Sequence, residues 1–269
     1  MKPTFSIITI TYNSERTLQR TIDSIKNQKY PNLEYIVVDS GSSDSTLSII
    51  TKNADVITKW ISEPDRGISD AFNKGINMAT GEIVGIINSD DQLSDGALQI
   101  IADNYSEKTK VYCGNLEIWN ERTGYKDIVK PTINFSFYKN NTICHPATFI
   151  SREVYAQYGM YNVDYKLAMD LDMLFRLYNS GLKFKYINKT LACFSMGGVT
   201  FSKFSHERMQ EIANIYRKNG ASELSVFIYV AIRTMKNILL KFINRDLVFK
   251  VKNKLVHLVK KNNTRREKE

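Results

Sequence analysis

The first ninety residues alternate between short apolar runs and longer stretches in which apolar residues recur every three or four positions. Short runs rich in β-branched residues are typical of buried strands, whereas the longer spacing is typical of amphipathic helices. Leu18, Ile22 and Ile25, for example, would share one face of a helix. The pattern predicts helices after the first two strands and over residues 68–79, and it predicts strands over 5–10, 35–38, 56–61 and 82–87.

This alternation predicts an α/β fold with a mainly parallel sheet and flanking helices. Parallel strands joined through helices form right-handed βαβ units, and the carboxyl ends of the strands meet at one edge of the sheet. Ligands of open α/β sheets bind at that edge. We therefore expect the loops that follow these strands to carry the functional residues.

The alternation changes after residue 95, in the half that we expect to carry the second substrate. We place a domain over residues 1–220 and a C-terminal helical segment over 221–269. The pattern after residue 95 predicts helices over 97–105, 171–178, 206–218 and from 223 almost to the end, and strands over 111–119, 125–129, 147–150, 184–187 and 191–194.

Charge separates the domain from the tail. Residues 233–269 hold 12 Lys and Arg against 3 Asp and Glu, a net charge of +9 that equals the formal net charge of the whole 269-residue chain. The domain is therefore electrically balanced, which argues against a nucleic-acid partner. Apolar clusters interrupted by Lys and Arg predict basic amphipathic helices that bind an anionic membrane surface. A helical hairpin packed on the domain is the alternative.

Cysteine use and the N-terminal sequence predict a cytoplasmic location. Cys113, Cys144 and Cys193 lie far apart and form no CxxC pair, so we expect neither a disulfide framework nor a structural zinc site. The chain shows no signal-peptide pattern, and no apolar segment reaches the roughly 18 residues that span a bilayer. We expect the protein to be peripheral on the inner face of the cell membrane.

The run GEIVGIINSDD, from Gly81 to Asp91, ends on two adjacent carboxylates. Neighbouring carboxylates repel each other, and a fold accepts that repulsion most readily when a divalent cation lies between them and an anionic ligand. The sequence therefore predicts a metal-bridged diphosphate at Asp90 and Asp91. A helix N-cap with an additional charge is the alternative, because Asp and Ser are favoured there.

Three further segments converge on this edge, namely Thr11-Tyr12-Asn13, Asp39, and the stretch from Asp65 to Lys74. With these segments, the chain resembles family 2 inverting glycosyltransferases, which have the Rossmann-like GT-A fold. The motifs DRGISDAFNKG and NSDD are similar to those of the bacterial branch that builds capsule, exopolysaccharide and lipopolysaccharide repeat units on a lipid carrier. The resemblance implies a nucleotide-sugar donor and a lipid-linked saccharide acceptor.

The resemblance also implies donor-binding roles along this edge. Asp39 would accept hydrogen bonds from the donor base, unless it only caps the turn that follows. Lys74 would reach the diphosphate, although a solvated lysine and an i,i+4 ion pair with Asp70 are alternatives. The expected donor-binding residues are Thr11, Tyr12, Asn13, Asp39, Asp70, Lys74, Asp90 and His145.

For the metal, the resemblance implies that Asp91 coordinates Mn²⁺ or Mg²⁺ and that Asp90 contacts the metal or the ribose. Asn88 takes the place of the first acid in the commoner DSDD form. Most of the metal shell should therefore consist of diphosphate oxygens and water, an arrangement that Mg²⁺ and Mn²⁺ tolerate.

The general base is expected later in the chain, in AMDLDMLFR. This segment resembles the family motif Glu-Asp-x-Asp, in which Asp170 has the position of the base and Met169 replaces the glutamate. Asp172 lies on the first helical turn, where a catalytic role and a helix-start role are both open. The resemblance places His145 against the donor sugar or the acceptor, with a structural histidine as the alternative. Gly197-Gly198 resembles a loop that closes over the donor.

The sequence thus predicts a metal-dependent inverting glycosyltransferase. It would move a hexose or N-acetylhexosamine from a nucleotide diphosphate sugar, expected to be a UDP-sugar, to a lipid-linked saccharide. One alternative is a polyprenyl-phosphate sugar synthase, and another is a non-catalytic nucleotide-binding scaffold whose tail binds membrane or RNA. A nucleotidyltransferase would usually carry a Gly-rich phosphate loop near its N-terminus, and the sequence has none there.

Overall fold

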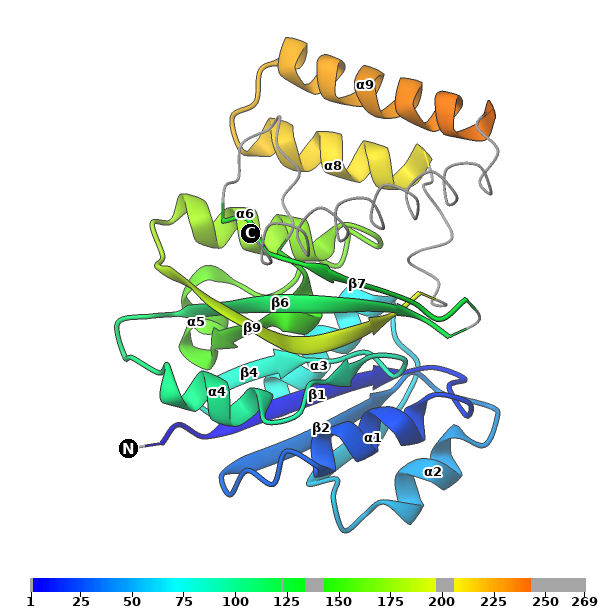
Figure 1. Cartoon of the computed structure of the whole chain (residues 1–269), viewed down its shortest axis with the longest axis vertical. Coiled ribbons are helices and arrows are strands. Elements are labelled where there is room, and N and C mark those ends of the chain that lie inside the picture. Colours follow the sequence, from blue (N-terminus) through cyan, green and yellow to red (C-terminus); the bar gives the residue numbers. More distant parts are fainter. Residues whose placement is uncertain (1, 122, 134–142, 197–205, 243–269) are drawn as a thin grey trace, which may run out of the picture. The chain divides into compact units, whose positions relative to one another are not determined.

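The computed structural model describes residues 2–121, 123–133, 143–196 and 206–242. Contacts within the chain define two units, Met1–Gly220 and Ala221–Glu269. The first unit is a mixed α/β structure in which helices flank a curled sheet (Figure 1).

The sheet of the described part of the first unit has nine strands in the order β3-β2-β1-β4-β8-β6-β9-β5, and β7 pairs with β6. Pairing is parallel between β1 and its neighbours β2 and β4, between β2 and β3, and between β6 and β9. Strand β8 runs antiparallel between β4 and β6. The predicted α/β class with a mainly parallel sheet is confirmed. The strands are β1 (Phe5–Thr11), β2 (Leu33–Asp39), β3 (Lys59–Ser62), β4 (Ile83–Ile86), β5 (Gln92–Leu93), β6 (Val111–Asn120), β7 (Tyr125–Val129), β8 (Thr148–Ser151) and β9 (Phe184–Ser195).

Helices connect these strands and cover both faces of the sheet. The parallel half follows the predicted order, with a helix between each pair of successive strands from β1 to β4. The helices of the first unit are α1 (Leu18–Lys26), α2 (Thr46–Lys52), α3 (Ile68–Met78), α4 (Ala97–Asp103), α5 (Arg152–Tyr158), α6 (Met169–Asn179) and α8 (His206–Lys218), together with the 3₁₀ turn η1 (His145–Ala147).

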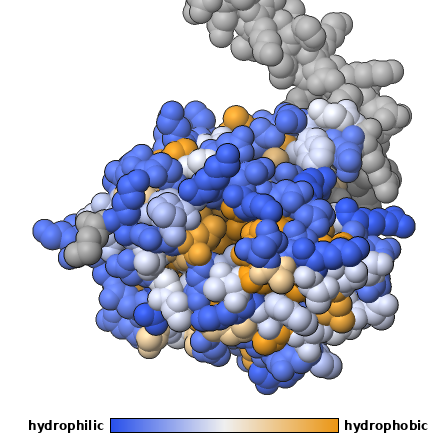
Figure 2. All heavy atoms as spheres, turned by 90° about the horizontal axis from the view of Figure 1, so that it is seen from below, coloured by the Kyte–Doolittle hydropathy of each residue, from blue (hydrophilic) through white to orange (hydrophobic). Residues whose placement is uncertain are grey.

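The core has two layers because successive residues of a strand point to opposite faces. On one face, Phe5 and Ile7 of β1 pack in one buried cluster with Leu18 of α1 and Leu98 of α4. On the other face, β1 approaches α3 so closely that a Cβ on Gly75 would lie 2.4 Å from Ile8 Cγ2. Hydrophilic side chains cover most of the surface in Figure 2, with hydrophobic ones visible between them, as expected for a core closed by a polar shell.

Several predicted boundaries were wrong. The strand expected over 56–61 begins at Lys59, because a turn over Asn53–Val56 follows α2. The strands expected over 184–187 and 191–194 are one strand, β9, which stays paired with β6 across a register shift beside Gly114. The strand expected over 147–150 starts at Thr148, after η1. Helix α5 was not predicted.

The second unit contains helix α9 (Glu223–Phe242). In the described residues, no helix is both long and apolar enough to cross a membrane. The part of the predicted helix that follows residue 242, and Gly197-Gly198, lie outside the described residues.

Candidate active site

The two acids of NSDD follow β4 at the carboxyl edge of the parallel strands. Asp91 is completely buried. Its Oδ1 accepts a hydrogen bond from the Ser195 amide at 3.2 Å, and its Oδ2 faces Asn88 Nδ2 at 3.3 Å. The Thr21 hydroxyl of α1 donates to the Asp91 carbonyl at 2.7 Å. The end of β9 and the first helix therefore hold this acid in place.

The electrostatics of these two acids oppose their ionisation. Burial, followed by the negative charge of Asp90, raises the pKa of Asp91 well above its ordinary value. Burial also raises the pKa of Asp90. The Arg20 guanidinium acts in the opposite direction on both and donates to the Asp90 carbonyl at 3.4 Å. Because the fold does not fully neutralise these two carboxylates, a cation beside them would stabilise their ionised forms.

Asn88 connects this acidic pair to a histidine. Its Nδ2 lies 3.3 Å from Asp91 Oδ2 and 3.2 Å from His145 Nε2, so the amide group can donate one hydrogen to each. Its Oδ1 is buried without a hydrogen-bond partner among the described residues. A buried polar atom without a partner is rare in a protein interior and marks a place where a further ligand would be stabilised.

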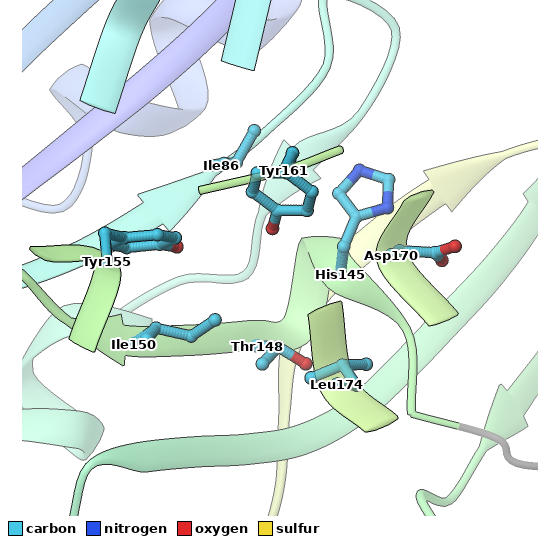
Figure 3. A pocket seen from close by; sticks show the side chains of 8 residues that line it. All are labelled: Ile86, His145, Thr148, Ile150, Tyr155, Tyr161, Asp170 and Leu174. Atoms are coloured by element: carbon cyan, nitrogen blue, oxygen red, sulfur yellow. The ribbon is translucent and has the colours of Figure 1, made fainter. Parts of the chain in front are cut away.

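His145 and Asp170 line one small pocket that also includes the last residue of β4 (Figure 3). The His145 ring packs on Phe72 of α3, with 5.6 Å between centroids, and Phe72 also meets Tyr161 at 5.0 Å. Burial lowers the pKa of His145 although the negative charge of Asp170 favours its protonation. The remaining residues of the lining are Ile86, Thr148, Ile150, Tyr155, Tyr161 and Leu174.

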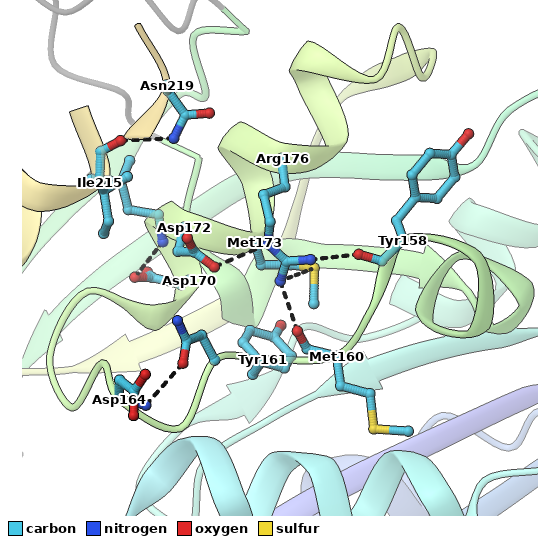
Figure 4. Close-up of polar contacts among 12 residues, drawn as sticks. Tyr158, Met160, Tyr161, Asp164, Asp170, Asp172, Met173, Arg176, Ile215 and Asn219 are labelled. Atoms are coloured by element: carbon cyan, nitrogen blue, oxygen red, sulfur yellow. Dashed lines mark hydrogen bonds and ion pairs between the residues drawn. The ribbon is translucent and has the colours of Figure 1, made fainter. Parts of the chain in front are cut away.

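The two candidate bases on α6 have different surroundings. Asp170 lies on the first turn, borders the pocket, and accepts a hydrogen bond from the Leu171 amide at 2.8 Å. Asp172 is buried and forms an ion pair with Arg176 at 3.0 Å. The Arg176 guanidinium also donates to the carbonyls of Tyr158 and Met160, at 2.6 and 2.7 Å (Figure 4). These contacts make Asp172 part of a structural clamp and favour Asp170 as the base.

Asp39 is buried where β2 ends and organises the loop that follows. Its Oδ2 accepts hydrogen bonds from the Gly41 amide at 3.2 Å, the Ser42 amide at 2.9 Å and the Ser62 hydroxyl at 2.6 Å. The Ser42 hydroxyl donates to its Oδ1. Asp39 therefore serves as a cap in this structure, and contact with a donor base would have to use the remaining acceptor capacity of Oδ1.

The segment after β1 forms the neighbouring wall. Thr11 is buried, and its Oγ1 has no hydrogen-bond partner among the described residues. Tyr12 is 62% exposed, so its ring is free to contact a ligand from solvent. Asn13 has a positive φ of 48°, and its Oδ1 accepts a hydrogen bond from the Ser43 amide at 2.9 Å. This wall thus joins the loop after β1 to the loop after β2.

The alternative of an i,i+4 ion pair between Asp70 and Lys74 is not found among the described residues. Asp70 instead pairs with Arg66 at 3.0 Å, and hydrogen bonds from Arg66 lower the pKa of Asp70. Lys74 pairs with Glu63 at 2.7 Å and donates to the Pro64 carbonyl at 2.8 Å. Each side chain thus has a partner on the loop that enters α3.

The oxygen-rich end of β4 suits a hard divalent cation. Asp90, Asp91 and the unpartnered Asn88 Oδ1 offer the oxygen ligands that Mg²⁺ and Mn²⁺ prefer. The described residues contain no group of three or more His, Cys, Asp or Glu side chains that could hold a metal ion. The donor set therefore fits a cation that takes most of its ligands from a bound diphosphate and water.

Three residues of this site were not singled out from the sequence. Arg20 of α1 stacks on Trp119, 4.9 Å from the ring centroid, and lies beside the acidic pair. Tyr155 and Tyr161 line the pocket. No local motif identifies them, since their roles depend on contacts between distant parts of the chain.

Comparison with known proteins identifies this class of α/β enzyme. Residues 6–159 match the glycosyl transferase family 2 profile, so the chain belongs to this family. An uncharacterized glycosyltransferase of Mycobacterium tuberculosis is 33% identical over 184 residues, which cover 65% of this chain and 68% of that protein. A PGL/p-HBAD biosynthesis glycosyltransferase of Mycobacterium bovis is 30% identical over 213 residues, covering 74% and 79%.

Solved structures with low sequence identity share the fold. TarS of S. aureus in complex with UDP-GlcNAc superposes with a TM-score of 0.63 at 20% identity and covers 85% of this chain and 70% of that one. The mannosyltransferase PcManGT from Pyrobaculum calidifontis, in complex with GDP-Man and Mn²⁺, gives 0.63 at 19% identity and covers 86% and 69%. The chain is thus a family 2 glycosyltransferase with the GT-A fold.

Proposed function

We propose that the protein is a metal-dependent inverting glycosyltransferase that moves a hexose or N-acetylhexosamine from a UDP-sugar to a lipid-linked saccharide. The observation that carries this proposal is the chain of contacts from Asp91 through Asn88 to His145, which borders the same pocket as Asp170. An acidic pair suited to a diphosphate and a carboxylate suited to a hydroxyl therefore lie in one site.

The proposed reaction is a single displacement at the anomeric carbon of the donor sugar. Asp170 takes the proton of the acceptor hydroxyl, and the oxygen of that hydroxyl forms the new bond to the anomeric carbon. The bond from the carbon to the diphosphate oxygen breaks, and its electron pair leaves with UDP. A divalent cation bound by Asp90 and Asp91 would neutralise the leaving diphosphate. The nucleotide complexes of TarS and PcManGT support a nucleotide-sugar donor, and Mn²⁺ in PcManGT supports the metal.

The activity is tested with a panel of UDP- and GDP-sugars and a membrane-lipid extract. We expect release of UDP and a lipid product, both dependent on Mn²⁺ or Mg²⁺, with Asp170→Asn as the inactive control. Nucleotide binding without turnover would instead indicate a non-catalytic binding protein. A product whose sugar is attached directly to polyprenyl phosphate would identify a synthase.

We further propose that the second unit binds the inner, anionic face of the cell membrane. Exposed Leu224, Phe227, Ile232 and Met235 lie on α9, and residues 233–269 carry the net charge of +9. Each basic residue near an anionic leaflet contributes about 1 kcal/mol, and buried apolar side chains add to this. The full chain should co-sediment with anionic liposomes at low salt and less at high salt, whereas protein ending at Gly220 should not. Equal sedimentation of the two proteins would refute this role.

A further inference from the structure

The segment from Tyr161 to Ala168, which leads into Asp170 on α6, is held by a carboxylate from a distant helix. Glu211 lies in the middle of α8. Its Oε1 accepts a hydrogen bond from the Lys166 amide at 2.9 Å, and its Oε2 accepts from the amides of Leu167 and Ala168, at 2.9 and 2.8 Å. We propose that Glu211 is a positioning residue for the base Asp170, an inference that rests on the proposed function.

Three consecutive amides converge on one carboxylate just ahead of α6. Ala168 is the N-cap residue of α6, so its amide has no partner inside the helix, and the amides of Lys166 and Leu167 precede the helix. The positive end of the helix dipole favours a negative group there. Ala168, the residue before α6, is buried, so its amide has little access to water. A glutamate supplies two oxygens with lone pairs enough for all three donors. A glutamine offers one oxygen and turns an NH₂ group toward at least one of the amides.

The same segment is anchored at its other end by α3, the helix of the DRGISDAFNKG motif. Asn73 pairs with the backbone of Tyr161 through two hydrogen bonds, of 3.0 and 2.8 Å. The Ser69 hydroxyl donates to the Tyr165 carbonyl at 2.8 Å. The segment is therefore fixed between the helix that enters the donor side of the site and α8, and α8 is part of the catalytic unit.

This anchoring should act on the rate more than on donor binding. Asp170 lies two residues after Ala168, so a shift of the segment moves the carboxylate that must reach the acceptor hydroxyl. A misplacement of about 1 Å can reduce a rate about 100-fold. In the part of the chain that the structure describes, Glu211 has no hydrogen bond to the proposed donor-binding residues at the ends of β1, β2 and β4. The binding of UDP should therefore remain.

The experiment measures kcat, KM for both substrates and the dissociation constant of UDP for Glu211→Gln and Glu211→Ala in the full chain. We expect kcat to fall about 10-fold for Gln and about 100-fold for Ala, while UDP binding changes less than about twofold. Glu207→Gln, one turn earlier on the exposed side of the same helix, should retain full activity. Hydrogen exchange should show faster exchange of the amides of 166–168 in both Glu211 variants.

A second control separates positioning from general loss of stability. Tyr216 of α8 packs on Phe175 of α6, with 5.7 Å between ring centroids. Tyr216→Leu should lower the melting temperature yet keep kcat near the wild-type value. Equal loss of kcat in Tyr216→Leu and Glu211→Gln at equal loss of stability would overturn the proposal, as would a wild-type kcat in Glu211→Gln. If the wild-type protein itself transfers no sugar, the proposed function fails instead, and the exchange data still test the anchoring.

Discussion

Glu34 at the amino edge of the parallel strands and Asp91 at the carboxyl edge are both largely buried carboxylates with opposite surroundings. Glu34 forms an ion pair with Lys59 at 2.7 Å and accepts hydrogen bonds from the Ser6 hydroxyl and from the amide and hydroxyl of Thr80. Burial alone would raise the pKa of Glu34, but these contacts outweigh it and lower the pKa to about 2. Burial and Asp90 raise the pKa of Asp91.

The buried polar atoms without partners show the same difference. Thr11 Oγ1, Arg20 Nε and Asn88 Oδ1 all lie around the carboxyl edge, and the described residues show no such atom around Glu34. A fold that satisfies one edge and leaves the other incomplete has sacrificed some stability at the incomplete edge, as binding sites commonly do. The polar groups at the amino edge therefore stabilise the sheet, whereas those at the carboxyl edge have the unsatisfied atoms typical of a binding site.

The largest expected effect is that of Asp91→Asn, which breaks the carboxyl edge. We expect turnover to be abolished and UDP binding in the presence of Mn²⁺ to weaken, because an anionic ligand is lost. A carboxyl whose pKa is raised on folding lowers stability at neutral pH, so its replacement by an amide should leave the melting temperature within about 3 °C of wild type or raise it. Wild-type activity that persists in EDTA would contradict the metal assignment.

Asp170→Asn and Asp172→Asn should separate chemistry from structure on α6. Asp170→Asn should keep the dissociation constant of UDP and lose at least about 100-fold in kcat, the low end of general-base catalysis. Asp172→Asn should mainly lower the melting temperature, because it leaves Arg176 without its buried carboxylate. A nearly active Asp170→Asn beside an inactive Asp172→Asn would show that the base is Asp172.

Glu34→Gln should have the opposite profile to Asp91→Asn, with stability lost and kcat kept. A carboxyl whose pKa is lowered on folding contributes stability above its unfolded pKa, and that contribution is lost as the pH falls through the folded pKa. For Glu34 the window extends from about pH 4.5 down to about pH 2. With allowance for solvent screening, we expect a loss of about 2 kcal/mol at pH 7, or about 4–8 °C in melting temperature. A wild-type-like thermal melt at pH 7 would contradict this role.

The sequence predicted the parallel half of the fold because its periodicity is local. Runs such as those at β1 and β2 have the length and composition of buried strands, and the acids that follow them had to meet at one edge. The insertion of β8 between β4 and β6 was not predictable, because strand order in this half depends on pairing between distant segments. The polar stretch after Ile187 predicted two separate strands. In the structure they form one strand, β9, because this stretch stays paired with β6.

The sequence predicted several of the residues that form the candidate site but not the hydrogen bonds that join them. Asp91, His145 and Asp170 were singled out from motifs, and Asn88 as the residue in place of the first acid. The hydrogen bond from Asn88 to His145 was not predicted, since it joins residues 57 positions apart. Glu211 gave no signal at all, because a glutamate on a polar helix resembles any solvated residue. Which distant side chains form hydrogen bonds with each other can be read only from the tertiary structure.

The smallest expected effects come from two lysines that form ion pairs of equal length, 2.7 Å, at the two edges. Lys59 binds Glu34, whose side chain is only 12% exposed, so Lys59→Met should lower the melting temperature and leave catalysis unchanged. Lys74 binds Glu63, whose side chain is 55% exposed and can give way to a diphosphate.

Lys74→Met should therefore weaken UDP binding by about 3- to 10-fold, the loss of one charge-assisted contact, with little change in stability. Glu63→Gln is the matched control, because it should free Lys74 and leave UDP binding equal or slightly tighter. Calorimetric titration with UDP and thermal melts of the wild type, Lys59→Met, Lys74→Met and Glu63→Gln test these expectations. If Lys74→Met instead lowers the melting temperature and leaves UDP affinity unchanged, the Lys74–Glu63 pair stabilises the fold as the Lys59–Glu34 pair does. The proposed difference between the two edges would then be wrong at Lys74.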